Sequence, residues 1–219
     1  MSPAASTLSV GLPMFPGVTA LDFIGPAQVL AARPGAKLHF ISRDLSPVPS
    51  DCGLALLPTT TLADCPPLDV LVIPGGPGQV AWMQDRDVLA WIAARGDAAR
   101  VVASACSGSL LLAAAGLLKG RRAASHWAFR ELLPHYGATP DAARVVIDGK
   151  FVTGGGVTAC LDMALRLLAE LDGQTLAEDV TLRLEYAPEP PFPTGRPEGL
   201  PAAQVARVRA ALMREAGLA

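Results

Sequence analysis

The sequence lacks a long hydrophobic run. Its longest apolar stretch, around residues 110–118, is interrupted by Gly116 and followed by Gly120, so it falls short of the roughly 18 residues that cross a bilayer. The first residues also lack the basic segment and apolar core of a secretory signal. We therefore expect a cytoplasmic protein with no membrane partner.

Charge is also sparse. Charged residues make up 17% of the 219 residues, the formal net charge is −2, and no basic run is present. Proteins that bind nucleic acid neutralise phosphates with clustered lysine and arginine, so we expect no nucleic-acid partner. Hydrophobic residues make up 51% of the chain, which is enough for a sizeable core.

Cysteine is scarce and widely spaced. The four cysteines are Cys52, Cys65, Cys106 and Cys160, and none forms a CxxC pair. We therefore expect no metal site, and free thiols in a reducing cytosol. Cys106 alone has neighbours that suggest chemistry, and we interpret the other three as packing residues.

Short apolar runs alternate with segments of helical periodicity, which predicts an α/β fold with a mainly parallel sheet and helices on both faces. Asp148-Gly149 between two apolar runs indicates one antiparallel hairpin. The expected strands are 7–15, 37–42, 70–74, 101–105, 144–147 and 151–153. The expected helices are 20–32, 80–96, 107–118, 127–136 and 158–171.

The chain is expected to form one α/β domain over residues 1–186. The segment 187–199 holds five prolines, so it is expected to be irregular. Beyond it, Val205, Val208 and Leu212 form an apolar stripe on a last helix. We expect this arm and helix, 187–219, to pack on the same domain or on a dimer partner.

Residues 101–112, VVASACSGSLLL, form the most informative stretch. A β-branched strand leads to Cys106, with Ser104 before it, Gly108 after it, and then a helical pattern. This order is typical of a nucleophile elbow, a tight strand–turn–helix bend that holds a reactive side chain above the sheet edge. The helix N-terminus would favour a thiolate. The alternative is a buried cysteine that only packs.

Asp22 follows the first strand and the Pro16-Gly17 turn, among apolar neighbours. If the two strands are adjacent, Asp22 lies at the same sheet edge as Cys106. A carboxyl in such surroundings has a raised pKa, so it could carry a proton at neutral pH and exchange it with the cysteine. The alternative, equally weighted, is that Asp22 caps a helix.

Two glycine-rich turns, 73–78 and 152–158, each follow a strand. Their backbone N–H groups and that of Ser107 could form an anion-stabilising pocket, although plain βα turns would show the same glycines. His126, about twenty residues after Cys106, would suit either a Cys–His dyad or a capping role. We favour the capping role for His126.

These motifs resemble the ThiJ/PfpI superfamily, and within it the isocyanide hydratase branch. The resemblance implies a flavodoxin-like fold, a cysteine on a strained elbow and a homodimer. The segment at 185–192 is the more specific pointer to the hydratases. The matching segments are 21–26 (LDFIGP), 72–78 (VIPGGPG), 104–110 (SACSGSL), 113–118 (AAAGLL), 124–127 (ASHW), 153–159 (TGGGVTA) and 185–192 (EYAPEPPF).

Several departures separate this chain from other branches. Ser107 stands where the hydratases carry threonine, which keeps the hydroxyl, and where the protease branch carries histidine. Asp22 stands where the glyoxalase and deglycase branch uses glutamate. Related transcription regulators need roughly 100 further residues for DNA binding, whereas about twenty follow the arm, so we expect no such activity.

The resemblance implies a cofactor-independent hydro-lyase that converts isonitriles to N-substituted formamides. Cys106 would attack the terminal carbon, Asp22 would supply or relay the proton, and water would hydrolyse the thioimidate. Backbone N–H groups at Gly76, Ser107 and Val157 would line the pocket. The alternatives are a glyoxalase- or deglycase-like enzyme acting on methylglyoxal, and a redox sensor built on Cys106.

Overall fold

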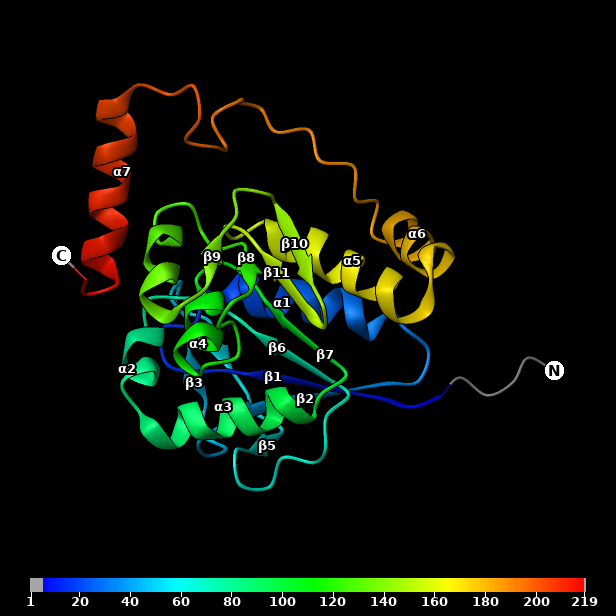
Figure 1. The fold of residues 1–219 in the computed structure, drawn as a ribbon. Helices are drawn as coiled ribbons and strands as arrows, with labels where there is room; N and C mark the ends of the chain where they lie inside the picture. The colour runs from blue at the N-terminus through cyan, green and yellow to red at the C-terminus, as the bar shows by residue number, and fades with distance from the viewer. Residues whose placement is uncertain (1–5, 219) are drawn as a thin grey trace.

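The computed structural model describes residues 6–218. Its main sheet is built from β1 (Leu8–Pro13), β2 (Ala36–Ser42), β5 (Thr60–Thr61), β6 (Val70–Ile73), β7 (Val101–Ser104), β10 (Val145–Asp148) and β11 (Phe151–Gly154). The seven strands run in the order β10-β11-β7-β6-β1-β2-β5 (Figure 1). Among the described strands of this sheet, only β10 and β11 pair antiparallel, which confirms a mainly parallel sheet and the hairpin at Asp148-Gly149.

Helices cover both faces of this sheet. On one face, α5 (Ala159–Asp172) packs between α1 (Ala20–Ala31) and α6 (Gln174–Arg183). On the other face lie α2 (Gln79–Met83), α3 (Arg86–Ala98) and α4 (Gly108–Ala114) (Figure 1). Every residue of β6 is buried, as a strand between two helical layers requires.

The remaining elements are short or peripheral. Residues 187–201 form neither helix nor strand, and they cross the molecule to α7 (Ala202–Glu215) on its far side (Figure 1). In residues 6–218, no helix is long and apolar enough to cross a bilayer. The other small elements are β3 (Val48–Pro49), β4 (Ala55–Leu56), β8 (Arg122–Ala123), β9 (Thr139–Pro140) and the 3-10 helix η1 (Arg130–Tyr136).

Three expected helices were wrong in extent or type. The expected helix 80–96 is two helices, because the carboxylate of Asp85 accepts the N–H groups of Asp87 and Val88 and starts α3. The expected helix 107–118 stops at Ala114, since Gly116 has φ +83°. Residues 127–136 contain only a 3-10 helix. Pro134 lies within it and has no backbone N–H group to donate the hydrogen bond that a regular α-helix needs. The sequence analysis also missed α6 entirely.

The topology decides which loops meet. After β2 the chain returns to the other side of β1 and pairs β6 there, so β1 and β6 flank a topological switch point. Ligands of such sheets bind beyond the carboxyl ends of the strands at this point. The loops that follow β1, β6, β7 and β11 therefore gather at one edge.

Candidate active site

Cys106 occupies the sharp turn between β7 and α4. It is a non-glycine residue with φ +55°, a conformation that L-residues rarely adopt. Hydrogen bonds from neighbouring loops hold this turn. The N–H of Cys106 donates to the Gly155 carbonyl at 2.9 Å, and its own carbonyl accepts from Ser125 Oγ at 3.2 Å and the His126 N–H at 3.3 Å. The loops after β8 and β11 thus support the strained residue.

Two glycines let the loops after β6 and β7 pack backbone against backbone. A Cβ at Gly108 would lie 2.4 Å from the carbonyl oxygen of Ile73. A Cβ at Gly75 would lie 2.7 Å from Ser107 Oγ and 3.0 Å from Asp22 Oδ2. Neither position has room for a side chain, so glycine is required at both for this approach.

Asp22 lies in the first turn of α1, fully buried beside Cys106. Its Oδ2 accepts the Gly75 N–H at 3.2 Å, while Oδ1 has no hydrogen-bond partner among the described residues. In residues 6–218, no N–H group of α1 donates a hydrogen bond to the Asp22 carboxylate, so the capping alternative fails. Burial raises the pKa of Asp22 to about 7, and the nearby charge of Asp51 adds to the rise, against the lowering effect of Cys106 and Gly75.

The Cys106 thiol is also buried, with 5% of the residue exposed. Burial raises the pKa of this thiol well above its usual range, and the negative charge of Asp22 raises it further. The backbone N–H and hydroxyl of Ser107 lower the pKa but do not outweigh burial. Burial and the charge of Asp22 thus oppose the preference for a thiolate that the helix N-terminus provides, and that preference stays a prediction.

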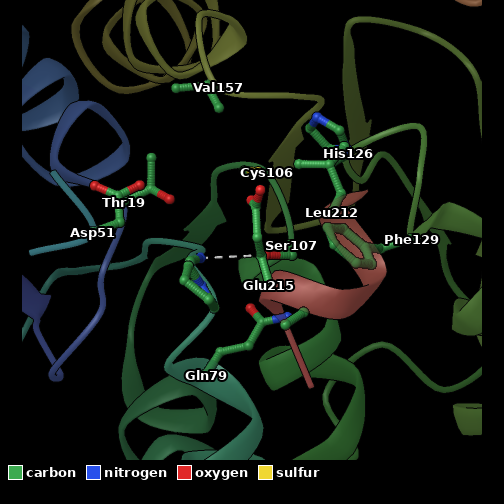
Figure 2. A pocket seen from close by; sticks show the side chains of 13 residues that line it. Thr19, Asp51, Gln79, Cys106, Ser107, His126, Phe129, Val157, Leu212 and Glu215 are labelled. Carbon is green, nitrogen blue, oxygen red and sulfur yellow. Dashed lines mark hydrogen bonds between the residues drawn. The ribbon is translucent and has the colours of Figure 1, made fainter. Parts of the chain in front are cut away.

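Ser107 and Gly76 link the two loops across the site. The Gly76 N–H donates to Ser107 Oγ at 3.3 Å, the dashed line in Figure 2. Ser107, Gly76 and Val157 all line the cavity that holds Cys106, as the sequence analysis expected of a shared pocket. Their role as anion-stabilising donors stays a prediction.

His126 also lines this cavity, but not as the partner of a dyad. Its Nδ1 accepts the Ala128 N–H at 3.2 Å, and no hydrogen bond joins the imidazole to the Cys106 thiol within the described residues. Burial lowers the pKa of His126 to about 4, so the ring is neutral at physiological pH. The contact with Ala128 fits the capping role.

The cavity has a volume of about 450 Å³ and is formed by loops from several elements together with α7 (Figure 2). Sequence reasoning missed many of its lining residues because they come from separate segments. No group of three metal-ligating side chains occurs in residues 6–218. The cavity is lined by Thr19, Asp51, Gly76, Pro77, Gln79, Cys106, Ser107, His126, Phe129, Val157, Leu212, Glu215 and Ala216.

Comparison with protein families matches residues 8–170 to the DJ-1/PfpI family. This chain belongs to that family. A crystal structure of a ThiJ/PfpI family protein from Pseudomonas syringae superposes with a TM-score of 0.92, at 43% identity over 98% of this chain and 90% of that one. Drosophila melanogaster DJ-1beta superposes with a TM-score of 0.75 at 26% identity, over 84% of this chain and all of that one. These family members confirm the flavodoxin-like fold.

Two curated relatives differ in how much of their length is shared. The family member from Pseudomonas putida named isonitrile hydratase is 51% identical over 93% of this chain and 90% of the hydratase. The transcriptional regulator CdhR of Pseudomonas aeruginosa is 31% identical over 77% of this chain but only 52% of the regulator. The likeness to the hydratase therefore extends along nearly the whole of both chains.

Proposed function

We propose that this protein is an isocyanide hydratase, a hydro-lyase that converts R–N≡C and water to R–NH–CHO. The observation that carries the proposal is 51% identity with isonitrile hydratase over nearly the full length of both proteins. The buried Cys106–Asp22 pair beside a cavity supports it, because the reaction needs a nucleophile and a proton carrier at one carbon. Hydration involves no net oxidation or reduction, so the proposed reaction requires no redox cofactor.

In the first half of the reaction, the thiol of Cys106 adds to the terminal isocyanide carbon. The sulfur–carbon bond forms as the thiol proton passes to Asp22 and from Asp22 to the same carbon. The product is a thioimidate, R–N=CH–S–Cys106. The positive φ of Cys106 supports its assignment as a nucleophile elbow, which would present the sulfur to the cavity.

In the second half, water adds to the thioimidate carbon and the nitrogen gains a proton. The resulting R–NH–CH(OH)–S–Cys106 collapses, the carbon–sulfur bond breaks, and the thiol regains its proton as the formamide leaves. Backbone N–H groups at Gly76, Ser107 and Val157 would stabilise the negative charge that develops on the sulfur of Cys106 and on the attacking oxygen during these steps. Splitting one difficult addition into two easier steps is ordinary nucleophilic catalysis.

The proposal is tested by hydration of p-nitrophenyl isocyanide, followed by ultraviolet absorbance. We expect turnover by the wild type, a loss of at least about a thousandfold in Cys106→Ala, and an unchanged rate in Cys52→Ala, whose exposed cysteine lies outside the cavity. Full activity of Cys106→Ala would exclude the covalent mechanism. If the wild type does not hydrate the isocyanide but converts methylglyoxal to lactate, the result would point to glyoxalase chemistry. If it turns over neither substrate while peroxide titrates Cys106, the result would point to a redox sensor.

We also propose that the protein is a cytoplasmic homodimer. The cytoplasmic location rests on the pattern of the sequence alone. The dimer is supported by an apolar groove on the surface of α1, β2 and β4, because apolar patches of this kind commonly mark interfaces. This α1 groove is lined by Phe23, Ile24, Ala27, Gln28, Ala31, Leu38, Phe40, Leu56 and Leu57.

A further inference from the structure

The cavity beside Cys106 combines apolar walls with negative charge. Phe129, Val157 and Leu212 supply apolar surface, whereas Asp51 and Glu215 supply carboxylates. No lysine or arginine lines the cavity within residues 6–218. A substituent carried into this space therefore meets negative charge with no lysine or arginine in the cavity wall to balance it.

Glu215 reaches the cavity because α7 lies against it. Leu212, Glu215 and Ala216 are spaced i, i+3 and i+4, so they share one face of the helix, and all three line the cavity. Figure 2 shows the Glu215 side chain directed into this space. No ion pair involving Glu215 is found among the described residues.

Gln79 provides an independent sign of a ligand. This first residue of α2 lines the cavity and is only 2% exposed. Its Oε1 is buried without a hydrogen-bond partner in residues 6–218. A buried carbonyl oxygen left unpaired costs free energy, and a donor on a bound molecule would remove that cost.

We propose that Gln79 and Glu215 select isocyanides whose substituent ends in a positively charged hydrogen-bond donor, such as a primary ammonium group. The inference rests on the proposed hydratase function and names the substrate class for it. With the isocyanide carbon at Cys106, the ammonium group donates to Gln79 Oε1 and to the Glu215 carboxylate. A carboxylate in the same place meets Asp51 and Glu215 as like charges, so it is rejected.

The test compares three isocyanides with alkyl chains of equal length, ending in an ammonium, a methyl or a carboxylate group. For the wild type we expect kcat/KM to favour the ammonium over the carboxylate substrate by about tenfold or more, mainly through KM. Glu215→Gln narrows this ratio to about threefold or less. For Gln79→Leu we expect the ratio of kcat/KM for the ammonium substrate to that for the methyl substrate to fall by about fivefold or more.

Glu170→Gln is the matched control, because it removes the same charge from an exposed position on α5, away from the cavity. We expect it to keep the wild-type ratio. A wild type that turns over the methyl substrate but does not discriminate between the charged ones overturns the inference alone, as does an unchanged ratio in Glu215→Gln. Failure to turn over any isocyanide overturns the hydratase function. Calorimetric binding of the three corresponding formamides then tests the charge preference directly, and tighter binding of the ammonium than of the carboxylate compound would support it.

Discussion

At the scale of single residues, the chemistry depends on two acidic groups, a carboxyl and a thiol, that are both buried. Asp22 and Cys106 lie side by side out of solvent, and burial raises the pKa of both. The form that reacts holds one proton between them, whether that proton sits on sulfur or on oxygen. This single-proton form becomes populated as the pair loses its first proton, at the pKa of about 7 assigned to Asp22.

The pH profile of kcat/KM follows from this shared proton. We expect kcat/KM for an aromatic isocyanide to rise with pH through about 7 and then level, because the doubly protonated pair is inactive. Asp22→Asn should lose the rise near pH 7 and fall in rate by about a hundredfold or more. A wild-type profile that declines through pH 7, or an Asn variant within twofold of the wild type, would remove Asp22 from the proton transfer.

The stability of the fold should depend on the same titration with the opposite sign, because the doubly protonated pair, whose neutral Asp22 favours the fold, is the form that is inactive in catalysis. The pKa of Asp22 rises from about 4 in the unfolded chain to about 7 in the fold, which corresponds to about 4 kcal/mol. The stability this group contributes is fully present below pH 4 and is lost as pH rises through 7. We therefore expect Asp22→Asn to raise the Tm relative to wild type more at pH 8 than at pH 5, as measured by thermal unfolding. An equal difference at both pH values would contradict an ionised, buried Asp22.

At the scale of elements, six of the seven strands of the main sheet and the central site motifs were predictable because their signals are contiguous, whereas the two-residue β5 was missed. The run 101–108 contains strand, cysteine and small residues together, and Asp22 follows its own strand directly. The position of Glu215 was not predictable, because only the tertiary course of residues 187–201 brings α7 to the cavity. A signal was nevertheless present: Glu215 lies three residues after Leu212, the last position of the predicted apolar stripe.

The close approach of the loops after β6 and β7 makes Gly75 a sensitive position. A methyl group there would press on Ser107 and Asp22 at once, so Gly75→Ala should displace the catalytic pair. We expect kcat to fall by about tenfold or more with a modest loss of Tm. Gly195→Ala is the control, since a Cβ at Gly195 meets nothing within 4 Å. Equal activity in both variants would show that this loop contact does not position the site.

At the scale of the whole molecule, a helix far along the sequence completes the wall of the cavity that holds Cys106. The α/β domain supplies the reacting pair, whereas Leu212 and Glu215 of α7 and the following Ala216 supply part of the cavity wall. We propose that the arm and α7 remain on the subunit whose cavity α7 lines. The chemistry thus lies at the sheet edge, whereas the choice of substrate is shared between Gln79 of the domain and Glu215 of the segment that follows it.

The α1 groove leads to a prediction about assembly. Ile24 is 40% exposed and Leu57 is 66% exposed, so both expose apolar surface that a second copy would bury. We expect light scattering after gel filtration to give the mass of two chains for wild type. The double variant Ile24→Lys with Leu57→Lys should give one chain, because a dimer would place these charges in an apolar interface.

Leu182→Lys is the matched control for this experiment, because Leu182 is 82% exposed on α6 and lies outside the groove. It should keep the mass of two chains. A monomeric wild type would exclude the dimer, and a dimeric double variant would move the interface to another face. Since the cavity is lined by residues of one chain, the monomeric variant should retain isocyanide turnover, and its loss with an intact fold would show that the second subunit supports the site.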